Sequence, residues 1–134
     1  MAIHHDTVVN EIHAMHADLA RWIGAPDEHE ARDRFVTQLH RDCSLVVLEG
    51  AVVSLEQLLQ LLDNAGNSLP GLTIDIVDLE ILHRSDGCVV VRFREIHHRP
   101  DGPASRWTTA LLLPDAQGRN GLRWRSVHET AAAD

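Results

Sequence analysis

The 134-residue sequence predicts one α+β domain spanning residues 1–134, in which helices fold over a curved sheet and enclose a small cone-shaped pocket. Three observations predict this class. Apolar residues recur every three or four positions up to about residue 65, as in helices that bury one face. From residue 71 onward they alternate instead, as in strands. Turn-forming segments separate these alternating stretches, so we expect a mainly antiparallel sheet of about five to six strands.

The first half of the chain is expected to hold the helices. They are predicted at residues 5–23, at 27–40 and from Leu55 onward, with a strand at 43–49 between the second and the third. The first has an apolar stripe at helical spacing: Val8, Ile12, Met15, Leu19 and Trp22. The third has the clearest start, because Ser54 can accept a hydrogen bond from the backbone of Gln57 while the Gln57 side chain reaches back.

The second half is expected to form an antiparallel meander. Its strands are predicted at about 72–84, 87–98, 104–114 and 121–130. In the first of these, Ile74 and Ile76 point to one side, whereas Val77, Leu79 and Ile81 point to the other. A change of phase at Ile76-Val77 predicts a β-bulge, which would bend the sheet around the helices. The alternative is a strand that is apolar on both faces.

Charge and composition limit the classes of partner. The formal net charge is -8, which argues against non-specific binding to nucleic acid. No apolar run is long enough to span a bilayer, and the N-terminal residues lack a signal-peptide pattern, so we expect a cytoplasmic protein. Cys43 and Cys88 are expected to be free thiols in a reducing compartment, although the sequence leaves a disulfide open.

Strand alternation predicts the lining of the pocket. Val89, Val91 and Phe93 share one face of their strand, and this face continues to Glu95 and His97. The corresponding faces of the next two strands are expected to hold Trp107, Thr109, Leu111 and Leu113, and Leu122, Trp124, Ser126 and His128. His16 flanks the apolar stripe of the first helix. The predicted ligand-binding residues are therefore His16, Phe93, Trp107, Thr109, Trp124 and Ser126.

Glu95 and His128 are the predicted catalytic pair. A carboxylate can orient an imidazole and raise its basicity, and such a pair could move a proton at a carbon next to a carbonyl group. Two alternatives remain: ligand binding without chemistry, and a satisfied structural contact. His13 and His16 lie about one helical turn apart but have no obvious third ligand, so neither a metal nor another cofactor is expected.

The closing strand also carries a family resemblance. Trp124, Arg125 and His128 match a tryptophan, a basic residue and a histidine that recur in the last strand of the nuclear transport factor 2-like superfamily. Over residues 8–130 the chain resembles its small bacterial domains, which are similar to polyketide-cyclase-like (SnoaL-like) proteins and to the association domain of calmodulin-dependent kinase. The resemblance implies a cone-shaped α+β fold and homodimers packed through the outer face of the sheet.

The resemblance leaves two functions open. One is a small-molecule-binding protein, with the option of an acid–base enzyme of cyclase, isomerase or lyase type acting on a small carbonyl compound. Tyrosine is absent, which disfavours the relatives that hold a substrate oxygen with tyrosine hydroxyls. The other is a non-catalytic homodimeric interaction module with a closed or vestigial pocket. Arginines interleaved with apolar residues on the expected outer face suit a homodimer contact: Arg92, Arg94, Arg123 and Arg125.

Overall fold

The computed structural model describes residues 3–133, which fold into three helices and one six-stranded sheet. The elements are α1 (His5–Gly24), α2 (His29–Thr37), β1 (Leu39–Val46), β2 (Val52–Ser54), α3 (Leu55–Ala65), β3 (Thr73–Arg84), β4 (Val89–Arg99), β5 (Gly102–Pro114), the 3-10 turn η1 (Arg119–Gly121) and β6 (Leu122–Ala131). The strand order is β2-β1-β6-β5-β4-β3. Strand β1 runs parallel to β6, and the other neighbours are antiparallel.

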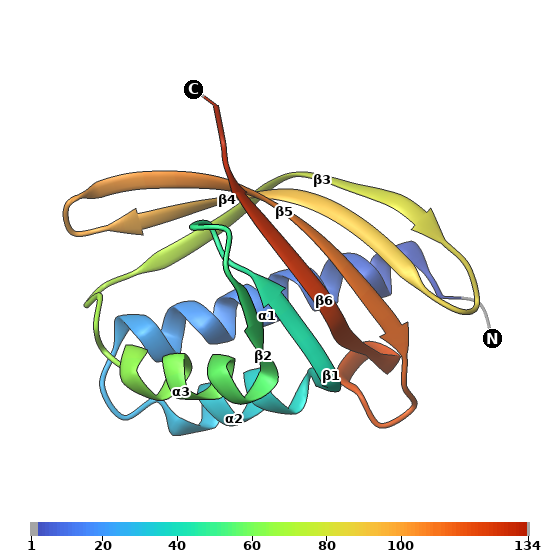
Figure 1. Cartoon of the computed structure of the whole chain (residues 1–134), viewed down its shortest axis with the longest axis horizontal. Coiled ribbons are helices and arrows are strands. Elements are labelled where there is room, and N and C mark those ends of the chain that lie inside the picture. Colours follow the sequence, from blue (N-terminus) through green and yellow to red (C-terminus); the bar gives the residue numbers. More distant parts are fainter. Residues whose placement is uncertain (1–2, 134) are drawn as a thin grey trace.

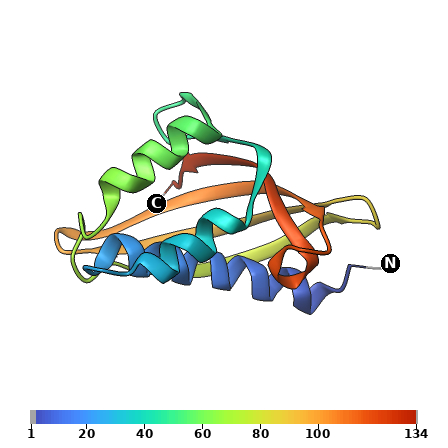
Figure 2. The same cartoon turned by 90° about the horizontal axis from the view of Figure 1, so that it is seen from below.

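The sheet curves over the helices, all of which lie on its concave side (Figure 1). Seen from below, α1 and α3 lie toward opposite edges of the sheet on this one face, with α2 between them (Figure 2). This is the cone-shaped α+β arrangement that the sequence predicts. The core fills the space between the layers and is centred on side chains with no more than 2 % exposure, such as Ile12, Phe93, Leu112 and Trp124.

Specific contacts fix both ends of helix α3. The Ser54 hydroxyl accepts from the backbone N–H of Gln57 and the Gln57 side chain accepts from the backbone of Ser54, so the predicted capping box is confirmed. The helix is followed by Gly66, where an added Cβ would lie 2.8 Å from the Trp22 ring. The indole N–H of Trp22 in turn donates to the carbonyl of Leu62 at 2.7 Å, which fixes the end of α3 against α1.

The segment between α2 and α3 differs from the prediction. Helix α2 ends at Thr37, strand β1 starts at Leu39 rather than at residue 43, and the short edge strand β2 was not predicted. The cause is long-range pairing: the carbonyl of Gln38 accepts from the backbone N–H of Trp124 at 2.9 Å, and Leu39 pairs with Trp124 in register. Pairing with β6 therefore ends the helix earlier than its local pattern indicates.

The predicted bulge in β3 is confirmed, slightly later along the strand. The register with β4 shifts between Val77 and Glu80, and Asp78 there has a φ of 53°. The extra residue returns Leu79 and Ile81 to the core side, where they pack on the buried cluster. A second shift follows between Ile81 and His83. These irregularities increase the local twist and bend of the edge strand.

Strand β6 contains a bulge that the sequence analysis missed. Leu111 pairs with Ser126 whereas Leu112 pairs with Trp124, so Arg125 is the extra residue. The strand therefore changes phase after Trp124, and the side chains beyond this point that face the core are those of Val127 and Glu129. The predicted inward positions of Ser126 and His128 are wrong for this reason, and the His128 side chain is exposed.

The predicted inner face of β5 is also wrong. The buried residues of this strand are Thr108, Ala110 and Leu112, so Trp107 and Thr109 lie on the outer face. Both faces of β5 carry apolar side chains, so alternation alone could not choose between them. The prediction for β4 is confirmed, since its buried residues are Val89, Val91, Phe93, Glu95 and His97.

Two other sequence-based expectations can be compared with the structure. Cys43, which is buried, and Cys88, which is half-buried, are both free thiols. Within residues 3–133, no helix combines the length and apolar character that crossing a membrane requires.

Candidate functional site

A small, mostly apolar cavity lies between the helices and the sheet. Its volume is about 80 Å³, below the roughly 300–1,000 Å³ of sites for drug-sized ligands. All three helices and strands β1, β4 and β6 contribute to its wall. The apolar lining includes Met15, Leu19, Phe35, Leu58, Trp124 and Val127, and the ionisable lining residues are His16, Cys43, Glu95 and Glu129.

Glu95 lies at the centre of the polar part of this lining. It points inward from β4 and is 3 % exposed. Its Oε1 accepts from Nε2 of His97 at 2.8 Å, and its Oε2 accepts from the Thr108 hydroxyl at 2.5 Å. Oε2 also lies 3.4 Å from Nε2 of His16. Burial alone would raise the pKa of Glu95, but the charge of His16 and the three donors hold that pKa well below its usual value.

His16 faces Glu95 from α1 in a fixed orientation. Its Nδ1 lies 2.8 Å from the carbonyl oxygen of Ile12, and because a carbonyl can only accept, Nδ1 carries a proton. The ring meets Phe93 and Trp124 edge-on, with centroid distances of 5.1 and 6.0 Å. Burial alone would lower the pKa of His16, but the charge and hydrogen bond of Glu95 raise it above the usual 6.5. The raised pKa of His16 and the lowered pKa of Glu95 both favour an imidazolium beside a carboxylate.

Glu129 is the second carboxylate of the cavity. It lies on β6, opposite Thr108 of β5, and its side chain is 13 % exposed. Nη1 of Arg106 donates to its Oε2 at 3.0 Å. Burial and the charge of Glu95 raise the pKa of Glu129 above its usual value, against the opposing effect of Arg106. Glu129 is therefore a stronger base than an ordinary exposed carboxylate.

The structure brings together half of the residues predicted for the site. His16, Phe93, Glu95 and Trp124 converge on the cavity or its immediate wall. The others lie on the outer face of the sheet: Trp107, Thr109, Ser126 and His128. The predicted pair of Glu95 with His128 is therefore wrong, and the imidazoles that contact Glu95 are those of His16 and His97.

Glu129 and Thr108 were missed by the sequence analysis, and His97 was placed inside without a role. A signal for Glu129 exists in the sequence. Trp124 and Val127 are three positions apart, an interval that indicates an extra residue in an otherwise alternating strand. Counting on from Val127 places Glu129, rather than His128, on the inner face.

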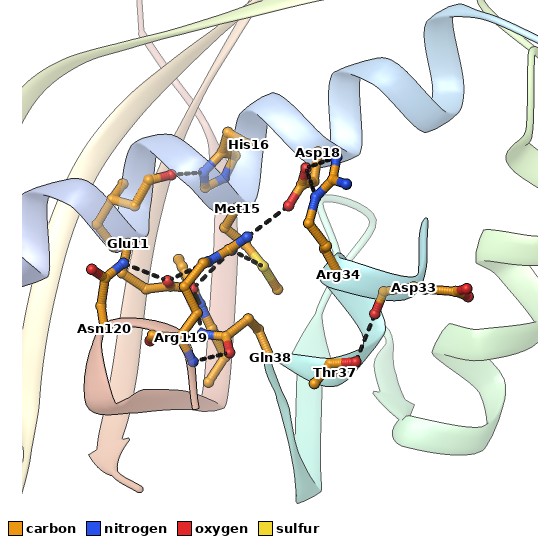
Figure 3. A network of polar contacts seen from close by, with 12 residues as sticks. Glu11, Met15, His16, Asp18, Asp33, Arg34, Thr37, Gln38, Arg119 and Asn120 are labelled. Atoms are coloured by element: carbon orange, nitrogen blue, oxygen red, sulfur yellow. Dashed lines mark hydrogen bonds and ion pairs between the residues drawn. The ribbon is translucent and has the colours of Figure 1, made fainter. Parts of the chain in front are cut away.

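A second buried polar network borders the cavity and is drawn in Figure 3. Glu11 is fully buried and accepts from Arg119 Nε at 2.9 Å, from Trp124 Nε1 at 2.9 Å and from the Gln38 amide at 2.8 Å. Asp18 accepts from Arg119 Nη1 at 2.8 Å and from Arg34 Nε at 3.0 Å. The two carboxylates are matched by two guanidinium groups, so this network ties α1 to the segment before β6 and fixes the Trp124 side chain at the cavity wall.

Across the described residues 3–133, no three or more His, Cys, Asp or Glu side chains are grouped in a way that could hold a metal ion. The cluster around Glu95 is instead held together by hydrogen bonds, because donors occupy both carboxylate oxygens.

Comparison with known proteins places the fold. No protein-family model matches the chain, and no curated protein sequence matches it significantly. Among solved structures, an NTF-2 like protein of unknown function from Pseudomonas aeruginosa is 28% identical, with a TM-score of 0.87 over 95% of this chain and 99% of that one.

More distant structures share the fold only. ActVI-ORFA from Streptomyces coelicolor is 14% identical, with a TM-score of 0.66 over 94% of this chain and 95% of its own. The association domain of C. elegans CaMKII is 9% identical, with a TM-score of 0.70 over 94% of each chain. The chain has the nuclear transport factor 2-like fold, and the resemblance noted in its sequence is confirmed.

Proposed function

We propose that the chain binds a small molecule in the cavity, with His16 and Glu95 holding the polar end of the ligand. The observation that carries this proposal is a buried charged pair that borders an apolar cavity. Burying two charges is costly unless they are well paired and hydrogen-bonded. Here His16 Nε2 lies 3.4 Å from Glu95 Oε2, longer than a good charge-assisted hydrogen bond, so its proton is available to a ligand.

The chemistry of the lining defines the ligand. The walls favour a compact apolar body, and the imidazolium N–H of His16 favours a hydrogen-bond acceptor such as a carbonyl oxygen. A small carbonyl compound meets both requirements, and the same cluster supports acid–base chemistry on it. A ligand larger than the cavity would need the wall to move. Helix α3 contributes Leu58 to that wall, and Leu62 is its only buried residue.

A ligand screen tests this proposal. Small ketones, aldehydes and carboxylic acids are added to the protein, and binding is followed by thermal shift and by amide chemical shifts in NMR. We expect ketones to stabilise the wild type and to perturb amides around the cavity. His16→Gln should weaken that binding at least about ten-fold, because the charged donor is lost.

Matched variants make the screen decisive. His128→Gln changes the same residue type on the outer face and should bind as the wild type does. Val127→Phe should abolish binding by filling the cavity that Val127 lines. Equal binding by His16→Gln and the wild type would contradict the assigned role of His16, and no perturbation near the cavity by any compound would contradict the proposed function.

A homodimeric interaction module is the second candidate, and the small cavity volume favours it. Half-buried apolar side chains and arginines share the outer face of the sheet, including Val90, Ile96, Trp107 and Leu111 with Arg92 and Arg94. Such a mixed surface is typical of subunit contacts. The structural similarity to the association domain of C. elegans CaMKII supports the same proposal.

The mass in solution tests the interaction module. We expect a dimer of 14.9 kDa chains at micromolar concentration by light scattering after size exclusion. Trp107→Glu should shift it toward the monomer, because a charge would be buried in the contact. Val52→Glu, at an exposed position on the edge strand β2, serves as the matched control. A monomeric wild type would exclude this candidate.

A further inference from the structure

We propose that Asn120-Gly121 is a site of spontaneous deamidation, and that the carboxylate formed there prevents the buried Glu11 network from re-forming. Water is the only co-reactant, so the proposal does not depend on which molecule the cavity binds. The modification would make the connection between β5 and β6 a one-way switch that acts on the wall of the cavity.

The sequence and the surface around it make this pair reactive. Of the four asparagines in the chain, only Asn120 is followed by glycine. The backbone nitrogen of the next residue attacks the asparagine side chain in deamidation, and glycine leaves that nitrogen unshielded because it has no Cβ. Gly121 is exposed, and both residues line a surface groove of about 380 Å³ together with His4 and Thr7. Water therefore reaches the pair.

The reaction balances with water alone. The backbone nitrogen of Gly121 loses its proton and bonds to Cγ of Asn120, which closes a five-membered succinimide ring. The bond from Cγ to Nδ2 breaks, and Nδ2 takes up the proton and leaves as ammonia. Water then opens the ring at one of its two carbonyl carbons. The product is an aspartate at position 120, linked to Gly121 through either its α- or its β-carboxyl group.

The native turn holds both reacting groups away from each other. The N–H of Gly121 donates to the carbonyl of Gly118 at 2.9 Å. The side-chain amide of Asn120 donates to Oε1 of Glu11 at 3.1 Å, so Asn120 faces α1 (Figure 3). Attack on Cγ requires both hydrogen bonds to break. The reaction therefore proceeds from a locally opened turn, and its rate depends on how often that turn opens.

Arg119 keeps this opening rare. Its backbone N–H donates to the Gln38 side chain at 2.6 Å, and its Nε and Nη1 donate to Glu11 at 2.9 Å and to Asp18 at 2.8 Å. These contacts tie the turn to α1 and to the start of β1. We therefore expect deamidation in the folded protein to be much slower than in a free peptide.

The product no longer fits the native turn. Glu11 is fully buried, and it would lose the amide donor of Asn120 and meet a second carboxylate in its place. The guanidinium group of Arg119 offers no free counter-charge, because its nitrogens already donate to Glu11 and Asp18. Glu11 also accepts from the indole N–H of Trp124, so the disturbance reaches the cavity wall.

Deamidation kinetics test the site and its control together. The protein and a synthetic peptide of residues 116–124 are kept at the same mildly alkaline pH, and mass spectrometry follows the replacement of the amide at position 120. We expect the protein to react at least about ten-fold more slowly than the peptide. Hydrogen exchange of the Gly121 amide measures the same opening, so its protection factor should equal this slowing within about three-fold.

Two variants at position 120 test the effect of the product. Asn120→Asp reproduces the α-linked product. Asn120→Gly removes the amide donor without adding a charge, and glycine suits the φ of 58° at this position. We expect Asn120→Asp to unfold at a lower urea concentration than Asn120→Gly. Asn67→Asp is the matched control, because Asn67 is exposed and has a similar φ of 54°, and it should unfold as the wild type does.

Each part of the proposal has a result that would overturn it. Equal deamidation rates in the protein and the peptide would contradict control by the turn. An unmodified Asn120 after the time that the measured protection factor allows would contradict the site itself. Equal urea midpoints of Asn120→Asp and Asn120→Gly would show that the new charge does not disturb the Glu11 network.

Discussion

At the scale of single residues, the environment of His16 determines which of its nitrogens can change charge. Nδ1 is fixed as a donor by the carbonyl of Ile12 at 2.8 Å, so protonation and deprotonation take place at Nε2, beside Glu95. The proton that stabilises the buried pair is therefore the same proton that faces the cavity. Stability and the proposed ligand contact therefore depend on the same nitrogen, and the pH dependence of stability reports on its charge.

Removing His16 should change the pH dependence of stability. The pKa of His16 is raised above 6.5 in the folded chain, so its contribution is complete below pH 6.5 and is lost as the pH rises through the folded value. We expect the unfolding free energy of the wild type to fall more steeply above pH 6.5 than that of His16→Gln. Urea unfolding, in pH steps upward from that value, measures this. Parallel curves would contradict the prediction, and His128→Gln should follow the wild type.

Cys43 should be an unreactive thiol despite lining the cavity. Burial raises its pKa to about 11 from the usual 9.0, against a smaller opposing effect of Arg125. At a given pH near 8 the thiolate fraction is then about 100-fold lower than for an ordinary cysteine. We expect iodoacetamide to modify Cys88 first and Cys43 only under unfolding conditions, as read by mass spectrometry of peptides. Equal labelling of both in the native protein would contradict this.

At the scale of elements, bulges decide which side chains enter the cavity. The bulge in β3 could be predicted, because Ile76 and Leu79 are apolar on opposite phases and both need burial. The bulge in β6 was harder to see, since polar Ser126 and His128 continue a plausible inner face after Trp124. Only the spacing from Trp124 to Val127 indicated it.

Local pattern predicted the elements that depend on local contacts. The face of β4 was correct because Val91 and Phe93 alternate with Arg92, which leaves no ambiguity. The end of α2 and the start of β1 were predicted at the wrong residues, because Leu39 pairs with Trp124, which is far away in the sequence. Single-strand alternation carries no information about such pairings.

The start of α3 should depend on its capping box. Ser54→Ala removes the hydroxyl that accepts from the Gln57 backbone at 3.2 Å, and we expect a loss of about 1 kcal/mol in unfolding free energy. Gln57→Glu keeps the reciprocal acceptor and adds a negative charge at the helix N-terminus, so it should be neutral or slightly stabilising. Urea denaturation of both variants measures the effect. Equal stability of Ser54→Ala and the wild type would show that the cap contributes nothing.

At the scale of the whole molecule, the Glu11 network joins the first helix to the last strand. Residues more than 100 positions apart meet there, as Arg119 and Trp124 both donate to Glu11. The same contacts hold Trp124 against the cavity. The fold and the site therefore share one support, and damage to the network should reach both.

Arg119→Met should be strongly destabilising. It leaves the fully buried Glu11 without its guanidinium partner, and breaking a buried pair from one side costs about 3–5 kcal/mol. The remaining donors from Trp124 and Gln38 place the expected loss near the lower end of that range. Arg34→Met is the matched control. Its side chain is 44% exposed, so the loss of its pair with Asp18 should cost no more than about 1 kcal/mol.

The double variant Glu11→Gln with Arg119→Met separates charge from packing. The amide introduced at position 11 would still offer an oxygen to the Trp124 indole N–H but carries no charge, so the double variant should recover at least half of the stability lost in Arg119→Met. Urea unfolding gives the stabilities, and titration with a small ketone that binds the wild type shows whether Trp124 still forms the cavity wall. If the double variant is no more stable than Arg119→Met, the loss comes from the methylenes and hydrogen bonds of Arg119 rather than from an unpaired Glu11 charge.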